Sequence, residues 1–470
     1  MVDEQEVRFH KITTEPVIGL LFRMAGPTII GMLVNAVYNM TDTFWIGKLN
    51  RVSLTASVGI VFSFVSMVQA IGFWFGYGSG NYMSRQLGQR NTDQAEEMAT
   101  AGLTLALVIG TLIMCLGLAG LAPLARLLGA DTSEEMMDVC QKYLGIILIS
   151  VPFSLGATTL YNQLRLQGNA KDGMIGLMVG MGINMVLDPI LILSFHMGIE
   201  GAGLATLLGQ VIGFGILLYL TGRHGNVRIK RKYCKHTVAY VHHILAGGAP
   251  NFARQGITAI AGVLLNQVAA GYGENAVAAF AITNRIVTMG FALVIGFGQA
   301  FQPICAYNYG AGLYDRVKRG FRFCVGFATV LLSVTAIGLF IFAGPLLNQF
   351  TNNRDVIQAG RYILWAQMVA FPLLGYYTMV GMLLQNMGRF LQATLVTIAE
   401  KGLLFIPAIL LLPCIFGWNG VVWAQPTASV LAAVFSFYFG RKAVKELTYA
   451  DGSASQQTDK RKIKQSGIQR

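Results

Sequence analysis

Four polar side chains lie near the end of the first apolar segment. They are Asn35, Tyr38, Asn39 and Asp42. Their spacing of three or four residues puts them on one face of an α-helix. Because a polar stripe cannot face lipid cheaply, we expect it to line a cavity inside a bundle of helices. Asp42 would bind a cation or a proton there, and the other three side chains would contact a substrate.

A second polar group lies in the fifth and sixth apolar segments. Asn184 and Asp188 are four residues apart, and Thr206 in the next segment adds a hydroxyl group. Together with Asp42, they form a hard, oxygen-rich site, which suits Na+ or protons and not zinc. We therefore predict a coupling-ion site in the first half of the chain, with no other metal and no cofactor. The alternative is that each acid only hydrogen-bonds neighbouring helices.

Two prolines and one pair of charges complete the candidate residues. Pro27 and Pro189 each interrupt a helix, so we predict that they act as hinges, the alternative being static kinks. Glu400 and Lys401 are adjacent in the eleventh segment and would point about 100° apart on an α-helix, which makes them poor partners for each other. We expect them to pair with other helices of the second half, and a proton-carrying role for Glu400 stays open.

The composition indicates that these residues are carried by membrane-spanning helices. Only 12% of the 470 residues are charged and 54% are hydrophobic, with a mean hydropathy of +0.55. Soluble domains carry about 25% charged residues, so soluble, disordered and disulfide-scaffold classes are excluded. The net charge of +13 arises from clusters between apolar runs, which argues against nucleic acid as a partner. The sequence has no phosphate-binding loop and no catalytic constellation, so we expect neither an ATP-driven pump nor an enzyme.

Twelve segments are long and apolar enough to cross a bilayer. They cover residues 18–46, 53–82, 95–121, 139–164, 173–195, 201–221, 243–271, 276–305, 320–344, 356–384, 392–415 and 421–440. If both termini are cytoplasmic, the inner loops carry 15 basic residues, Arg165 among them, and the outer loops carry 6. The positive-inside rule therefore predicts a multi-pass protein of the cell membrane with both ends in the cytoplasm.

The two halves of the chain align at six positions with offsets of 218 to 223 residues. Pro27 pairs with Pro250, and the last aligned pair is Gly201 with Gly420. Parallel repeats of six spans predict two pseudo-symmetric six-helix bundles around a central cavity, the architecture of alternating access. We place a cytoplasmic segment at 1–16, one lobe at 17–222, a basic linker at 223–242, the second lobe at 243–440 and a disordered, lipid-attracting cytoplasmic tail at 441–470.

Several motifs make the chain resemble the multidrug and toxic compound extrusion (MATE) family of secondary transporters over roughly residues 15–440. They are AGP at 25–27, YNMTDTFWIG at 38–47, SRQLG at 84–88, RLQG at 165–168, NMVLDP at 184–189 and GIEGAG at 198–203. The resemblance implies two six-helix lobes and export of cationic or amphipathic compounds, driven by Na+ or H+ entry. In the DinF-like branch the ion site lies in the first lobe. Asn162 resembles a further polar residue of that lobe. Acids that another branch carries in segments 7 and 10 are absent here.

These patterns predict a secondary multidrug exporter that acts by alternating access, as a monomer in membrane lipid. Two rivals stay open. One is a flippase for lipids or lipid-linked sugars with the same two-lobe architecture, and the other is a channel or a non-transporting membrane scaffold. The buried acids of the first half favour the exporter, because a flippase for a pyrophosphate head group would favour a more cationic cavity.

Overall fold

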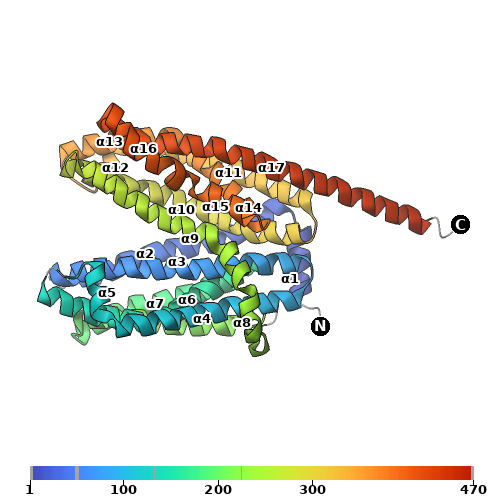
Figure 1. Cartoon of the computed structure of the whole chain (residues 1–470), viewed down its shortest axis with the longest axis horizontal. Helices are drawn as coiled ribbons and strands as arrows, with labels where there is room; N and C mark the ends of the chain where they lie inside the picture. Colours follow the sequence, from blue (N-terminus) through green and yellow to red (C-terminus); the bar gives the residue numbers. More distant parts are fainter. Residues whose placement is uncertain (1–3, 48–51, 132, 224, 467–470) are drawn as a thin grey trace. The chain divides into compact units, whose positions relative to one another are not determined.

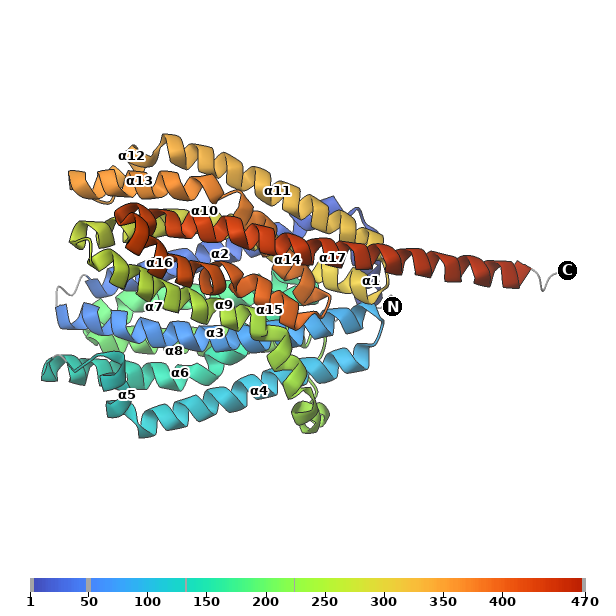
Figure 2. The same ribbon diagram turned by 45° about the horizontal axis from the view of Figure 1, so that its top comes forward.

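The computed structural model describes residues 4–47, 52–131, 133–223 and 225–466 (Figures 1 and 2). Of residues 35–44, 46–47, 52–53, 55 and 452–466 it describes the backbone alone. All regular structure in these ranges is helical, which confirms the predicted all-α membrane fold. The chain divides into two compact units, Met1–Lys11 with Gly26–Phe252, and Ile12–Ala25 with Ala253–Arg470.

The first half of the chain contributes ten helical elements. They are α1 (Glu4–Thr14), α2 (Val17–Gly47), α3 (Val52–Gly88), α4 (Thr92–Ala119), α5 (Leu121–Leu128), α6 (Glu134–Leu166), α7 (Ala170–Pro189), the π-helical segment η1 (Ile190–Ser194), α8 (Gly198–Thr221) and the 3-10 helix η2 (Arg231–His236). Helix α6 is the central one, because it packs against α3, α4, α7 and α8. It buries 67% of its most apolar stretch.

The second half of the chain repeats this plan. Its elements are α9 (Thr237–Ala270), α10 (Glu274–Gly310), α11 (Tyr314–Ile341), α12 (Ala343–Asn348), α13 (Arg354–Ala370), α14 (Leu373–Asn386), α15 (Phe390–Ile398), the π-helical segment η3 (Ala399–Leu404), α16 (Phe405–Phe416) and α17 (Trp418–Ser466). The fifth long helix ends in a π-helical segment, η1, in the first half and is interrupted by one, η3, in the second half. Such segments widen a helix locally and are frequent at functional sites.

Ten of the described helices are long and apolar enough to cross a membrane. An eleventh span is formed by α13 and α14 together, which are bent by 53° at Phe371 and Pro372. The prediction of twelve spans exceeds this number by one, at α9. That helix has ample length, but its sequence includes His242, His243 and Arg254, which lower its apolarity.

The first long helix of each half is divided between the two units. Helix α2 belongs to the second unit up to Ala25 and to the first unit from Gly26 onward. Helix α9 changes in the opposite direction, after Phe252. Each change of unit lies within two residues of a proline, Pro27 in α2 and Pro250 in α9. The two units therefore exchange the first turns of their equivalent helices.

The exchanged segments are packed tightly into the units that receive them. In the first unit, the indole N–H of Trp74 donates to the carbonyl oxygen of Leu245 at 2.7 Å, and its ring stacks on Phe252 with centroids 4.1 Å apart. In the second unit, Phe22 meets the rings of Phe297 and Phe327, each at 5.6 Å. Aromatic contacts of this kind stabilise a packed interior beyond the area they bury.

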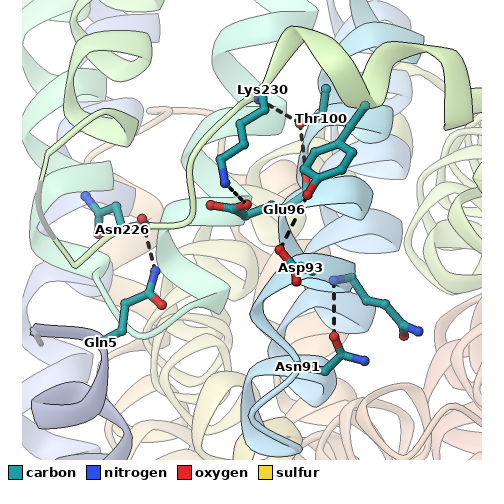
Figure 3. A network of polar contacts seen from close by, with 9 residues as sticks. Gln5, Asn91, Asp93, Glu96, Thr100, Asn226 and Lys230 are labelled. Atoms are coloured by element: carbon teal, nitrogen blue, oxygen red, sulfur yellow. Dashed lines mark hydrogen bonds and ion pairs between the residues drawn. The ribbon is translucent and has the colours of Figure 1, made fainter.

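The segment between α8 and α9 is fastened to the first unit by polar contacts (Figure 3). Lys230 forms an ion pair with Glu96 on α4, and its backbone N–H donates to the hydroxyl of Thr100 at 3.1 Å. The side chain of Gln5 on α1 donates to the carbonyl oxygen of Asn226 at 3.3 Å. The described residues of the basic linker thus belong to the first unit.

The chain after residue 441 differs from the prediction. It was expected to be a disordered tail, but α17 continues without a break to Ser466 (Figure 1). The residues that follow Arg441 include Ala, Lys, Glu and Gln, which are good helix formers, and no proline occurs among them. A helix already nucleated by the preceding apolar span extends at little cost through such residues.

Candidate functional site

One face of α7 is buried along its whole length. The residues on this face are Gly173, Gly176, Gly180, Asn184 and Asp188. They recur every three or four positions, so glycine occupies the first part of the face and polar side chains the second. The glycines let a neighbouring helix approach, and the polar residues then meet that helix at close range.

Helix α8 makes this close approach through glycines of its own. The α-carbon of Gly213 and the carbonyl oxygen of Gly209 are so near Gly180 that a side-chain carbon there would lie 3.1 Å and 2.9 Å from them. These distances are shorter than normal contact, so only glycine fits. The backbone spacing between α7 and α8 is therefore set by the glycines at 180, 209 and 213.

The same spacing brings two of the predicted ion-site residues together. The side-chain amide of Asn184 donates to the hydroxyl oxygen of Thr206 at 3.2 Å. Asn184 is only 2% exposed, and its side-chain oxygen has no hydrogen-bond partner among the described residues. Both residues line a pocket between α6, α7 and α8 with an empty volume of about 350 Å³. A buried oxygen acceptor of this kind can serve as a ligand for a hard cation.

Asp188 lies one turn beyond Asn184 on the same face and is 0% exposed. Pro189 is the last residue of α7, and the helix continues from it into the wider η1 segment. The buried carboxylate therefore lies where the regular helical hydrogen bonding changes. A carboxylate at this depth carries charge that a cation or proton can neutralise.

The polar stripe predicted for the first long helix lies in the second half of α2. Helix α2 is continuous through it, so the predicted common face is compatible with the backbone. The side chains of Asn35, Tyr38, Asn39 and Asp42 lie outside the described residues. Pro27 lies inside the same helix, two residues after the change of unit at Ala25.

Asn162 is buried in α6 but does not line the pocket of Asn184 and Thr206. Its amide donates to the carbonyl oxygen of Thr158 at 2.8 Å, and its side-chain oxygen accepts from Arg165 at 3.1 Å. Arg165 was assigned to a cytoplasmic loop, yet it is 0% exposed, with its guanidinium 5.0 Å from the ring of Tyr77. The correction follows from the length of α6, which includes Arg165 in its last turn.

Glu400 and Lys401 lie in η3 of the second unit and contact each other after all. The ammonium of Lys401 is 3.7 Å from a carboxylate oxygen of Glu400. It also donates to the side-chain oxygen of Gln425 at 2.9 Å, while the amide nitrogen of Gln425 donates to Glu400. The hydroxyl of Ser429 donates to the same carboxylate oxygen at 3.3 Å. The wider turn of the π-helical segment and the long lysine side chain make the contact between neighbours feasible.

Sequence reasoning missed the partners Arg165, Gln425 and Ser429. Gln425 and Ser429 are four residues apart, and this common face was a signal that could have found them. For Arg165 there was no such signal, because a basic residue at the end of an apolar run usually lies in a loop.

Comparison with known proteins assigns the chain to a family. The MatE family model matches residues 27–190 and 250–410, more than two thirds of the chain in two parts. These two parts correspond to the two halves of the predicted duplication. Each begins at or near the proline where a long helix changes unit.

Relatives and solved structures match over nearly the whole chain. The multidrug export protein MepA of Staphylococcus haemolyticus is 26% identical, covering 93% of this chain and 96% of its own. MepA of Staphylococcus aureus is also 26% identical, covering 92% and 95%. An outward-facing multidrug resistance MATE transporter of the MOP superfamily superposes with a TM-score of 0.86 at 24% identity, covering 93% and 98%. A MOP superfamily transporter from Pyrococcus furiosus, described as having a binding pocket of reversed polarity, gives 0.85 at 24% identity, again covering 93% and 98%.

Proposed function

The chain belongs to the MatE family, and from this premise we propose that it exports amphipathic or cationic organic compounds in exchange for Na+ or H+. The observation that carries the proposal is the buried face of α7, which presents Asp188 and Asn184, with Asn184 hydrogen-bonded to Thr206 of α8. The multidrug export proteins that match over nearly the full length support the substrate class.

The proposed ion site combines Asp188, Asn184 and Thr206 with Asp42 of α2. A Na+ ion would take oxygen atoms from the carboxylates, the amide and the hydroxyl group, and a proton would bind either carboxylate. Binding of either cation removes negative charge from the membrane interior, which favours a tighter packing of the helices around it. A cationic substrate competes for the same charge, so ion uptake and substrate release are linked.

The proposed movement takes place in α2. Pro27 leaves one carbonyl of the helix without its usual donor, so bending there costs less than elsewhere. Because α2 changes unit next to this proline, bending changes how the polar stripe of α2 meets α7. Alternating access would follow from two states of this helix, one with the substrate bound and one with the ion bound.

The remaining assignments belong to the same proposal. We place the chain in the DinF-like branch and in the cell membrane, as a monomer in lipid with both termini in the cytoplasm. The transporter uses no cofactor other than its coupling ion and no nucleic acid. The absence of acids from α9 and from residues 356–384 supports coupling through the first unit.

The experiment is drug export from proteoliposomes under an imposed Na+ gradient and, separately, an imposed pH gradient. We expect Asp188→Asn and Asp42→Asn each to reduce gradient-driven export about tenfold or more. The neutral amide can neither take up and release a proton nor offer a negative charge to Na+. Asp138→Asn is the matched control, since this acid is exposed at the start of α6 and pairs only with Lys142 in the described contacts. Export that survives both substitutions would refute the proposed site.

Counterflow separates the carrier from its rivals. A carrier loaded with unlabelled substrate on one side accumulates labelled substrate transiently from the other side, and the rate saturates. A channel shows neither behaviour. Transport of a fluorescent phospholipid in the same vesicles without drug export would favour the flippase.

A further inference from the structure

The second unit has a polar site close to the positions that the repeat relates to the proposed ion site of the first. The repeat offset near these helices is 219 residues, as for Gly201 and Gly420. Adding it to Thr206 gives Gln425, and Glu400 falls within three residues of the equivalent of Asn184. In each unit, therefore, the fifth long helix carries a buried polar side chain that is hydrogen-bonded to a polar residue of the sixth.

The two sites share carboxylate, amide and hydroxyl groups, and they differ in that the second also has an ammonium group. The first unit presents carboxylate, amide and hydroxyl groups and has no lysine on the buried face of α7. The second unit presents Glu400, Gln425 and Ser429, and it adds the ammonium of Lys401. The Glu400 side chain is 11% exposed and that of Lys401 is 34% exposed, so the lysine lies on the more open side of the carboxylate.

The surroundings of Glu400 offer no other described ion pair. Helix α17 faces it with the neutral Gln425 and Ser429, and α14 contributes the phenol of Tyr377, which packs on Ala399. Helices α15 and α16 carry no charged residue. Helix α9 reaches η3 through Ile257 beside Gly402, and its Arg254 lies one turn earlier. Lys401 is thus the cation held against this carboxylate.

We propose that Lys401 is a built-in counter-cation that occupies the role of the coupling ion in the second unit. The ammonium neutralises Glu400 permanently, so this unit keeps a carboxylate in the membrane without taking up Na+ or H+. The single lysine therefore determines that only the first unit is ion-coupled. This inference rests on the proposed function for the role of the first unit, but its test does not require transport.

The test is thermal unfolding of the purified full-length protein in detergent, followed by intrinsic tryptophan fluorescence. Lys401→Met leaves Glu400 as an uncompensated buried charge, which either a proton or Na+ can neutralise. We expect its melting temperature at about pH 8 in Na+-free buffer to fall by about 5 °C or more below the wild type. The deficit should shrink at about pH 5.5 or with about 150 mM Na+, because binding to the folded state stabilises it.

Glu400→Gln gives the opposite sign and makes the test sharper. It leaves the lysine uncompensated, so its deficit should shrink as the pH rises and should not respond to Na+. The double variant Glu400→Gln/Lys401→Met has neither charge, and Lys401→Arg keeps the charge; neither should respond to Na+ or acid more than the wild type does. Lys445→Met on α17 is the matched control, because this lysine is exposed.

Three results would overturn the proposal. In the first, Lys401→Met melts like the wild type under all conditions. In the second, its deficit persists in acid and in Na+. In the third, Lys401→Met and the double variant both fail to fold, which would assign the lysine to packing. If Lys401→Met fails to fold and the double variant folds, the result supports the proposal, since it shows that the uncompensated carboxylate causes the loss of stability. The proposed function is tested by drug export in Asp188→Asn, and the role of Lys401 is tested by thermal unfolding. Failure of one proposal can therefore be distinguished from failure of the other.

Discussion

The glycine contact between α7 and α8 can be tested by adding a single methyl group. In Gly209→Ala the new carbon would lie 2.7 Å from the carbonyl oxygen of Gly180 and 3.1 Å from the β-carbon of Asn184. Ordinary contact begins at 3.4 Å. Both neighbours belong to α7, and one is backbone, so the two helices must separate by about 0.7 Å to relieve the overlap.

This separation acts directly on the proposed ion site. The distance from Asn184 to Thr206 is 3.2 Å, so it would lengthen to about 3.9 Å, beyond the range of a hydrogen bond. Overpacking costs about 1–3 kcal/mol, and the lost hydrogen bond adds about 0.5–1.5 kcal/mol. We therefore expect a loss of about 1.5–4.5 kcal/mol in the free energy of unfolding. Export should also fall, because the ligands of the ion no longer lie at their proper distance.

The assay is thermal unfolding in detergent combined with gradient-driven export from proteoliposomes. Gly182→Ala is the matched control on α7 and Gly215→Ala on α8, since a β-carbon at either position meets no atom within 4 Å. Each control replaces glycine by a better helix former and should be neutral or stabilising by up to about 1 kcal/mol. If Gly209→Ala behaves like the controls in both measurements, the close approach does not set the geometry of the site.

Two further predictions concern polar contacts near the beginnings of α9 and α11. Tyr240 has a raised pKa because of its burial and its hydrogen bond to Glu97 at 2.7 Å, so the folded state holds this proton more tightly than the unfolded chain. The contribution of this hydrogen bond to stability is complete below about pH 10 and is lost as the pH rises further. The difference in melting temperature between the wild type and Tyr240→Phe should therefore become smaller above that pH. A difference that stays constant would contradict this prediction. Arg316 donates hydrogen bonds to the carbonyl oxygens of Ile12, Thr14 and Glu15. Lysine lacks the forked guanidinium that makes these bonds together, so Arg316→Lys should loosen this segment. We expect faster tryptic cleavage at the exposed Lys11 in this variant. Arg319→Lys, whose side chain is 75% exposed, should leave the cleavage rate unchanged, and equal rates in both variants would refute the role of Arg316.

The sequence predicted the fold and part of the site because both depend on periodic patterns. Low charge and long apolar runs indicated an all-helical membrane protein, and the structure confirms that class. The spacing of Asn184 and Asp188 predicted their common face, which is buried in α7. Thr206 could be proposed as their neighbour only from its type and its place in the next segment.

The rest depended on contacts that no local pattern reveals. The partner of Asn162 is Arg165, and the two meet because α6 continues to Leu166, past the predicted end of the segment at residue 164. The contact between Glu400 and Lys401 arises in a π-helical segment, which changes the angle between successive side chains. The continuation of α17 to Ser466 could not be predicted, because polar residues are typical both of disordered tails and of exposed helices.

The division of α2 and α9 between the two units has a consequence for how the chain can be cut. In the terms used for oligomers, the units are domain-swapped within one polypeptide. The beginning of α2 belongs to the second unit and the beginning of α9 belongs to the first. A gene split at residue 224 would give a first fragment without the segment that carries Leu245 and Phe252, and a second without Phe22. Neither fragment then contains all the residues of one unit. The two fragments must therefore be produced together and associate, so that each provides the helical segment that completes the core of the other.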